Sequence, residues 1–296
     1  MKAFVTGACG QLGFDVMNEL IKRGYEVIGS DIQNSTDMKF TYIQLDITDE
    51  EAVRNILIEL NLDFVIHCAA WTSVDDAEDE VNISKVRAVN VDGTRNITNV
   101  CKKIDCKMMY ISTDYVFNGQ GNEPWQPDCK DYDPQNVYGQ SKLDGELVVA
   151  NTLTKYFIVR IAWAFGFNGN NFIKTILRVG KSSSPVRVIN DQIGTPTYTL
   201  DLARLLIDMV ETEKFGYYHA TNEGEYISWY DFAVEIFKQA RINTRIMPVT
   251  TAEYGLSKAK RPLNCRLDRS KLATNGFIPL PSWQNAISRY LKEIKN

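Results

Sequence analysis

The chain has 296 residues, a net charge of −4 and 24% charged residues, so it lacks a basic footprint and we expect no nucleic-acid partner. No uninterrupted apolar run approaches the length of a membrane span, and Met1 leads straight into the first predicted strand, which predicts a cytoplasmic protein without a signal peptide or membrane partner. Six cysteines without a C-x-x-C pair, and only two histidines, indicate reduced thiols and no bound metal.

A glycine-rich loop at residues 6–13 follows the first predicted strand, residues 2–5, and opens a predicted helix over residues 14–22. In this G-x-x-G-x-x-G pattern, Gly7 permits a tight turn, Gly10 lets the backbone approach a pyrophosphate, and Gly13 allows close helix–strand packing. The order strand, loop, helix favours dinucleotide binding over a glycine-rich turn without a ligand. The cofactor-binding residues predicted in the loop are Gly7, Gly10, Gln11, Leu12 and Gly13.

The second predicted strand, residues 25–31, ends in an acid, Asp31. A carboxylate there accepts hydrogen bonds from the adenosine ribose hydroxyls and repels a 2′-phosphate. Residues 32–35 contain no Lys or Arg to hold that phosphate, so we expect NADH to be preferred. NADPH use stays open if Asp31 turns away or Lys39 reaches in, and the alternative interpretation is that Asp31 only caps a turn.

Strands and helices then alternate along the chain. Further strands are predicted at residues 63–67, 107–111 and 156–161, and helices at residues 50–60 and 82–103. This alternation predicts an α/β protein whose Rossmann-like, doubly wound parallel sheet carries helices on both faces. Ligands bind at the carboxyl ends of such strands. The residues that fall there, and are expected to share one cleft, are Gly10, Asp31, Ala69, Ala70, Trp71, Thr113 and the loop after Ile161.

A possible proton donor follows in Tyr138 and Lys142. The i, i+4 spacing places the phenol and the ammonium on one helix face, where the lysine charge is expected to lower the tyrosine pKa towards neutrality. Such a phenol can protonate a carbonyl oxygen. Together with the glycine loop, the pair predicts a hydride-transfer enzyme.

The pattern loosens after residue 166, where turn-rich loops occupy residues 166–172 and 190–197. Helices are predicted at residues 199–212, 229–240 and 282–294, and short strands near 217–220 and 245–249. We therefore expect a NAD(P)-binding Rossmann domain over residues 1–165. Residues 166–296 would form a smaller C-terminal α/β substrate lobe, with some segments returning to the main sheet.

These residues resemble those of extended short-chain dehydrogenases/reductases, and in particular of the dTDP-4-dehydrorhamnose reductases. The resemblance covers nearly the whole chain. Its segments are residues 112–117, 137–139 with Lys142, 169–172, 190–192 with Gly194, 196–197, and 261–262 with Asn264.

The resemblance implies that NADH delivers hydride to the C4 ketone of dTDP-4-dehydro-L-rhamnose, giving dTDP-L-rhamnose for cell-envelope or extracellular polysaccharide. Tyr138 would protonate the developing alkoxide, Thr113 would hydrogen-bond the same oxygen, and Lys142 would hold the nicotinamide ribose. Cofactor neighbours by resemblance are Asp46, Ile47, Ala69, Ala70, Trp71, Thr72, Tyr138 and Lys142. Sugar neighbours are Thr113, Asp114, Tyr115 and Trp163. Alternatively, Asp46 caps a helix beginning near Thr48, and Trp163 is ordinary core.

The C-terminal segments suit a nucleotide diphosphate. Arg261 can grip a phosphate with its planar donor fork. Amide, carboxylate and ring surfaces suited to a nucleotide come from Asn171, Phe172, Asp191 and Gln192. The alternative is that Lys258, Lys260 and Arg261 form a solvated basic turn.

Other functions fit parts of this pattern. Dehydratases on this scaffold carry a glutamate where this chain has Tyr115, which disfavours dehydration. A nucleotide-sugar epimerase, a reductase for another 6-deoxysugar and a non-catalytic NAD(P)-binding regulatory subunit remain alternatives. Some relatives are Mg²⁺-dependent dimers built through acidic residues; Asp15 stands where a longer glutamate is expected, which makes Mg²⁺ doubtful and leaves monomer and homodimer open.

Overall fold

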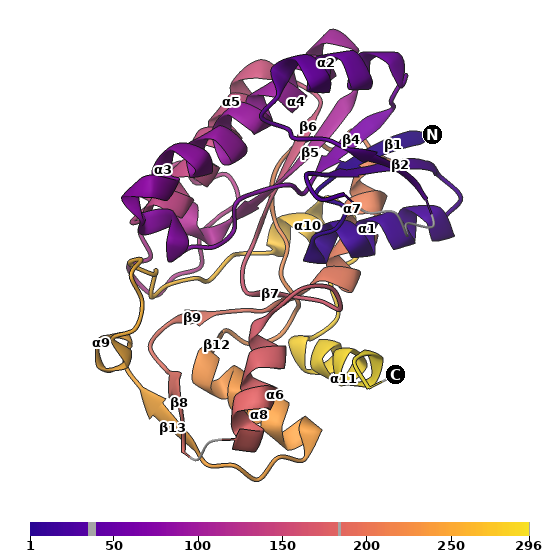
Figure 1. The fold of residues 1–296 in the computed structure, drawn as a ribbon. Coiled ribbons are helices and arrows are strands. Elements are labelled where there is room, and N and C mark those ends of the chain that lie inside the picture. Colours follow the sequence, from indigo (N-terminus) through magenta and orange to yellow (C-terminus); the bar gives the residue numbers. More distant parts are fainter. Residues whose placement is uncertain (35–39, 183–184, 296) are drawn as a thin grey trace.

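The computed structural model describes residues 1–34, 40–182 and 185–295. Within these residues, the larger lobe is built on a seven-stranded sheet in the order β11-β6-β5-β4-β1-β2-β3, with every neighbouring pair parallel (Figure 1). This order confirms the predicted doubly wound α/β fold. The strands of this sheet are β1 (Lys2–Thr6), β2 (Glu26–Asp31), β3 (Thr41–Gln44), β4 (Phe64–His67), β5 (Lys107–Thr113), β6 (Tyr156–Ile161) and β11 (Gly216–His219).

Helices cover both faces of the sheet because successive strand residues point to opposite sides. Ala3 and Val5 pack with helices α1 (Gln11–Lys22) and α7 (Thr199–Val210), whereas Phe4 packs on the other face. The helices of that other face are α2 (Glu50–Glu59), α4 (Thr94–Lys103) and α5 (Val137–Thr152).

The helix predicted over residues 82–103 is interrupted. It consists of α3 (Glu80–Arg87), a π-helical turn η2 (Ala88–Gly93) and α4. The Asn90 side chain in the π turn accepts from the Trp71 backbone N–H (2.8 Å) and donates to the Ser141 hydroxyl (2.9 Å). The π turn therefore ties the loop after β4 to α5.

The smaller lobe holds most of the remaining elements. The sequence predicts a turn-rich loop over residues 166–172. In the structure, Phe172 instead begins a helix whose buried face includes Ile173 and Ile176. The helices here are α6 (Phe172–Ser182), α8 (Trp229–Ala240), α9 (Thr251–Tyr254) and α11 (Trp283–Glu293), and α10 (Ser270–Thr274) lies beside β11. The short strand pairs are β7 (Ala164–Phe165) with β10 (Thr197–Tyr198), β9 (Ile193–Gly194) with β12 (Ile227–Ser228), and β8 (Val186–Ile189) with β13 (Ile246–Val249).

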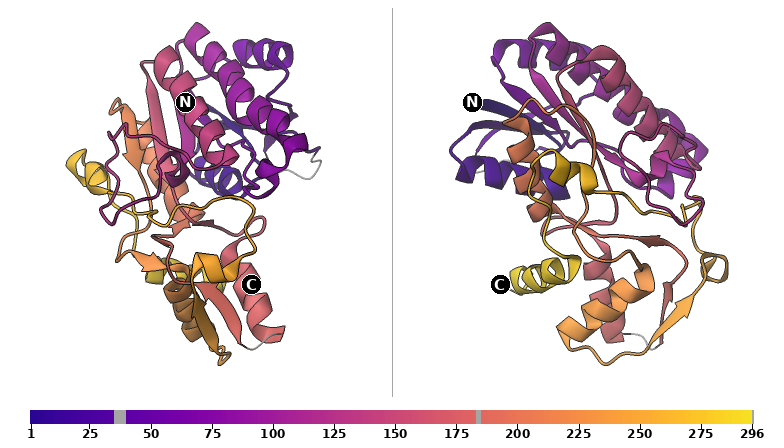
Figure 2. Two further views of the ribbon diagram at one scale, coloured as in Figure 1. Left: turned by 90° about the vertical axis from the view of Figure 1, so that its left-hand side faces the viewer. Right: turned by 180° about the vertical axis from the view of Figure 1, so that it is seen from behind.

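The chain crosses between the lobes more than once. After β10 it returns to the larger lobe, where α7 packs against α1 and β11 pairs with β6 (Figure 2). Residues 199–219 thus lie with the sheet although they follow residue 166. The boundary at 165/166 remains a prediction.

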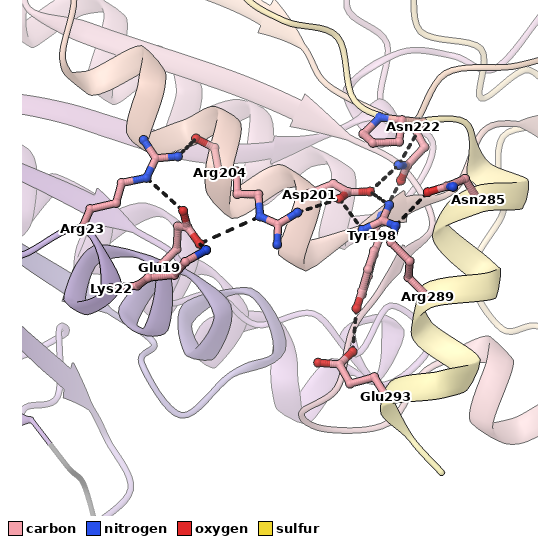
Figure 3. Close-up of polar contacts among 11 residues, drawn as sticks. Glu19, Lys22, Arg23, Tyr198, Asp201, Arg204, Asn222, Asn285, Arg289 and Glu293 are labelled. Carbon is pink, nitrogen blue, oxygen red and sulfur yellow. Dashed lines mark hydrogen bonds and ion pairs between the residues drawn. The ribbon is translucent and has the colours of Figure 1, made fainter. Parts of the chain in front are cut away.

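A polar network joins α11 to the larger lobe. The Arg289 guanidinium on α11 donates to both oxygens of the Asp201 carboxylate on α7, and Asp201 also accepts from the Asn222 amide (2.9 Å) (Figure 3). On the α1 side, Glu19 binds Arg23 (2.9 Å) and lies 3.9 Å from Arg204 of α7. Because the Asp201 side chain is buried, losing its partner would leave a charge without compensation.

None of the helices among the described residues is both long and apolar enough to cross a membrane.

Candidate active site

A cavity of about 710 Å³ lies at the carboxyl ends of the sheet strands, beside the smaller lobe. It brings together most of the residues singled out from the sequence. These are Gly7, Gly10, Gln11, Leu12, Gly13, Asp31, Asp46, Ile47, Ala69, Ala70, Thr72, Thr113, Asp114, Tyr115, Tyr138, Lys142 and Trp163.

The glycine loop has the geometry expected for a pyrophosphate site. Gly7 adopts φ +67, and a Cβ there would come within 2.7 Å of the Ala69 nitrogen. A Cβ on Gly13 would lie 2.0 Å from the Gly7 carbonyl oxygen. Gly10 is the N-cap of α1 and offers no side-chain cap, so the first amides of this helix are available to an anion. The loop therefore fits a dinucleotide cofactor.

Asp31 ends β2 at the cavity rim. Its Oδ2 accepts the Cys9 N–H (3.1 Å) and its Oδ1 accepts the Gln33 N–H (3.3 Å), so it braces the glycine loop as well as its own turn. Ser35 and Lys39, which bear on NADPH, lie outside the described residues.

Asp46 lies beside Ile47 in the lining and accepts hydrogen bonds from the Thr48 N–H (2.9 Å) and hydroxyl (2.8 Å). The alternative that Asp46 caps the next helix is wrong, because the cap of α2 is Asp49.

The catalytic candidates meet where β5 faces α5. Thr113 ends β5 and lines the same cavity as Tyr138, the second residue of α5. The Thr113 hydroxyl donates to Oδ1 of Asp114 (3.1 Å) and accepts the Tyr115 N–H (3.2 Å). The Asn136 side chain caps α5 by accepting from the Gly139 N–H (2.7 Å). The Tyr115 ring packs edge-on against the Tyr138 ring, with centroids 5.6 Å apart. Thr113, Tyr115 and Tyr138 thus form one side of the cavity.

Burial governs the acid–base properties of the pair. Lys142 lies one turn from Tyr138 and is 3% exposed. Burial lowers its pKa to about 7, although the Glu146 carboxylate opposes this shift. Burial also raises the pKa of Tyr138, and the nearby Thr113 hydroxyl offsets only part of this rise. The expectation that Lys142 lowers the tyrosine pKa is therefore wrong for this arrangement, because desolvation of the phenol dominates.

Two residues of the cavity lining each carry a buried polar atom without a hydrogen-bond partner among the described residues. These atoms are the Ser112 hydroxyl oxygen and Oδ2 of Asp114. Burial raises the pKa of Asp114 to about 6, opposed by hydrogen bonds from Cys265 and Thr113. Buried polar atoms normally have partners, so these two suit the hydroxyls of a polar ligand.

Trp163 forms the wall nearest the smaller lobe. It has a left-handed backbone (φ +50), and its indole stacks on that of Trp229 at 3.9 Å. Trp229, the first residue of α8, also lines the cavity and was not predicted as a site residue. Its only sequence signal is an aromatic residue at a predicted helix start. Other lining residues missed from the sequence include Ser30, Cys68, Ser112 and Thr199.

Several predicted residues lie outside the lining. Asn171 donates to the Gln11 side chain (3.1 Å) and to the Tyr290 hydroxyl (2.9 Å), so its amide joins the glycine loop to α11. Phe172 packs on Trp229 at 4.6 Å. The lining also omits Trp71, whose indole donates to the Ser73 carbonyl at 3.0 Å.

Asp191, Gln192 and Arg261 likewise bind protein groups. Asp191 accepts the Thr251 N–H (2.9 Å), and the Gln192 amide donates to the Thr251 hydroxyl (3.1 Å). Arg261 forms a two-pronged pair with Asp75. Lys258 and Lys260 are exposed and form surface contacts with Asp79 and Gln135, as the alternative of a solvated basic turn allows, whereas Arg261 is half-buried. Nucleotide contacts of Asn171, Phe172, Asp191, Gln192 and Arg261 stay predictions.

Asp15, which stands where a glutamate is expected in relatives that depend on Mg²⁺, lies on α1 and is 3% exposed. Its carboxylate accepts the Thr199 hydroxyl, and burial raises its pKa to about 6. No group of three His, Cys, Asp or Glu residues within the described ranges could hold a metal ion.

Comparisons with known proteins cover the full chain. The family model for the RmlD substrate binding domain matches residues 1–296. The chain is 37% identical to the spore coat polysaccharide biosynthesis protein SpsK of Bacillus subtilis over 99% of this chain and 97% of that one. It is 37% identical to a dTDP-4-dehydrorhamnose reductase of Aggregatibacter actinomycetemcomitans, over 97% of each chain. The crystal structure of dTDP-4-dehydrorhamnose reductase from Bacillus anthracis in complex with NADP superposes with a TM-score of 0.90, 37% identity and 99% coverage of both chains.

Proposed function

We propose a function from the premise that this chain belongs to the dTDP-4-dehydrorhamnose reductase family. It is a nicotinamide-dependent reductase that transfers hydride from NAD(P)H to the C4 ketone of dTDP-4-dehydro-L-rhamnose, giving dTDP-L-rhamnose. The observation that carries the proposal is that Thr113, Tyr138 and Lys142 line the same cavity as the glycine loop. The similarity to SpsK supports use of the product in a surface polysaccharide.

The residues divide the cavity into a cofactor side and a sugar side. The glycine loop would hold the cofactor pyrophosphate, Asp31 the adenosine ribose and Lys142 the nicotinamide ribose. When bound, NAD(P)H supplies the hydride. Ser112 and Asp114 would hydrogen-bond sugar hydroxyls with their unpartnered atoms, and the stacked Trp163 and Trp229 would cover the sugar.

Tyr138 supplies the proton from its hydroxyl. Because burial raises its pKa, the phenol is fully protonated at neutral pH, which is the form a reduction requires. An alkoxide is a stronger base than a phenolate, so protonation of the C4 oxygen is favourable from this phenol. The Thr113 hydroxyl, which lines the same cavity as Tyr138, would hydrogen-bond the C4 oxygen and stabilise the developing charge.

NADH is proposed as the preferred cofactor because Asp31 places a negative charge where NADPH carries its 2′-phosphate. The similar protein from Bacillus anthracis is described with NADP, so this preference rests on Asp31 rather than on relatives.

The deciding experiment is NADH and NADPH oxidation with enzymatically generated dTDP-4-dehydro-L-rhamnose, with the product sugar identified by NMR. A reductase oxidises one cofactor per sugar and yields dTDP-L-rhamnose. An epimerase recycles its cofactor, and a regulatory subunit changes neither sugar nor cofactor. Either of these results would contradict the proposal, and a product with the other configuration at C4 would show that the enzyme makes a different 6-deoxysugar from the same substrate.

A further inference from the structure

Residues 258–261, called the strap below, connect the smaller lobe to the rim of the cavity. The backbone N–H groups of Lys258 and Ala259 both donate to Oδ1 of Asp75 at 3.0 Å. Arg261 adds its Nη1 to Oδ1 (2.9 Å) and its Nη2 to Oδ2 (2.7 Å). One carboxylate thus binds four donors of the strap. Thr72 and Val74, just before Asp75, line the cavity.

The strap is also attached to the helix that carries the catalytic tyrosine. The Asn136 side-chain amide donates to the Lys260 carbonyl (2.9 Å), while its oxygen accepts the Gly139 N–H (2.7 Å). A single side chain therefore caps α5 and holds the strap. Tyr138 is the second residue of this helix.

Arg261 connects the strap to the sugar side of the cavity. Its guanidinium lies near enough to the Tyr115 phenol for the two groups to interact electrostatically, and the Tyr115 ring packs edge-on against that of Tyr138. A guanidinium has five N–H donors, so the two given to Asp75 leave others for a phosphate. The Arg261 side chain is 22% exposed, so the guanidinium is still partly accessible to a ligand from solvent.

The contacts between Asp75 and the strap should remain in place when a ligand binds. Ala259 is 3% exposed, so removing Asp75 from the strap would strand a buried backbone N–H as well as that of Lys258. The Arg261 hydrogen bonds hold the pKa of Asp75 below its usual range, so the carboxylate remains charged at neutral pH. A ligand phosphate therefore meets an arginine that is already oriented.

We infer that Asp75 is a positioning residue for the nucleotide diphosphate: it fixes the strap so that Arg261 binds the diphosphate while Tyr115 stays against Tyr138. The inference rests on the proposed function for the identity of the ligand. It assigns Asp75 no contact with the substrate and no part in proton transfer.

Asp75→Asn tests the inference because it keeps the shape of the side chain and removes its charge. We expect the Kd for dTDP, measured by calorimetry, and the KM for the dTDP-sugar to rise on the order of tenfold, while the KM for NADH stays within about twofold. Asp79→Asn is the matched control, because Asp79 pairs with Lys258 through an exposed contact at 2.9 Å. We expect it to leave all three constants near wild type.

Asp75→Glu provides a second variant that keeps the charge but displaces it, and it should weaken dTDP binding in the same direction. Thermal unfolding identifies which variants fold. Unchanged or tighter dTDP binding in a folded Asp75 variant would overturn the inference, as would an equal rise in the KM for NADH. Wild-type protein that binds dTDP but reduces no sugar would contradict the proposed function alone, since the dTDP measurements still decide the role of Asp75. Wild-type protein that does not bind dTDP would overturn the inference.

Discussion

The Lys142 ammonium lies over the Tyr110 ring, with Nζ 4.0 Å from the ring centroid. Tyr110 is fully buried on β5, and its hydroxyl donates to the Lys142 carbonyl (3.3 Å). The ring face attracts the cation and compensates for part of the hydration that burial removes. Burial of Lys142 nevertheless disfavours its charged form. Ionisable groups whose pKa values are shifted in this way are common at functional sites.

Replacing Tyr138 by Phe should remove the proton donor and leave the packing against Tyr115 in place. We expect kcat to fall by about 10² to 10⁴ because the proton donor is lost, while NADH still binds because the ring and the rest of the cofactor site are kept. Steady-state kinetics and NADH fluorescence titration measure the two effects. Turnover close to that of the wild type would contradict the role assigned to Tyr138.

Replacing Lys142 by Met should stabilise the fold while reducing activity. Burial lowers the pKa of Lys142 from its ordinary 10.5 to about 7. Between these two values the unfolded chain binds more protons than the folded chain, so Lys142 makes stability rise with pH across this window. Below about pH 7 the folded state carries the full cost of the buried charge, on the order of a few kcal/mol.

The variant should therefore unfold at higher urea concentration than the wild type near pH 6.5, and the difference should shrink towards about pH 10. NADH affinity and kcat should both fall, because the ribose contact is lost. Identical pH profiles of stability in the two proteins would show that the lysine is not held at a cost.

The sequence predicted best what depends on neighbours along the chain. The glycine loop, the end of β2 at Asp31, and the pair Tyr138 and Lys142 follow from local spacing. Thr113 was placed correctly at a strand end although β5 runs two residues beyond the predicted 107–111. Because ligands bind at the carboxyl ends of parallel strands, residues predicted at several strand ends could be expected to line one cavity.

Features that depend on distant partners could not be predicted. Asp75 lies 186 residues from Arg261, and nothing in either local pattern indicates that they pair. The stack of Trp163 on Trp229 joins two lobes in the same way. The direction of the Tyr138 pKa shift was wrong because spacing shows which charge is near, but burial depends on the whole fold.

Chelation by EDTA should leave activity within about twofold of the untreated enzyme. A Mg²⁺ ion needs accessible oxygen ligands, whereas Asp15 is buried and its carboxylate accepts the Thr199 hydroxyl. The measurement is kcat/KM after dialysis against EDTA, with and without added MgCl₂. Loss of activity that only Mg²⁺ restores would show that acidic residues other than Asp15 form a metal site.

The last prediction concerns Asp31 and the choice of cofactor. Its carboxylate is fixed at the rim by the Cys9 and Gln33 amides, so it cannot turn away without leaving the Cys9 N–H unpaired. Two like charges about 4 Å apart at an effective dielectric near 20 repel by roughly 4 kcal/mol before rearrangement. If about 1.4 kcal/mol of this repulsion remains after rearrangement, NADH would bind about tenfold more tightly than NADPH. Asp31→Ala should reduce the preference for NADH over NADPH, mainly by improving NADPH binding. The measurement is kcat/KM for both cofactors in the wild type and in the variant. Equal use of the two cofactors by the wild type, or a preference for NADPH, would show that the charge of Asp31 does not select the cofactor.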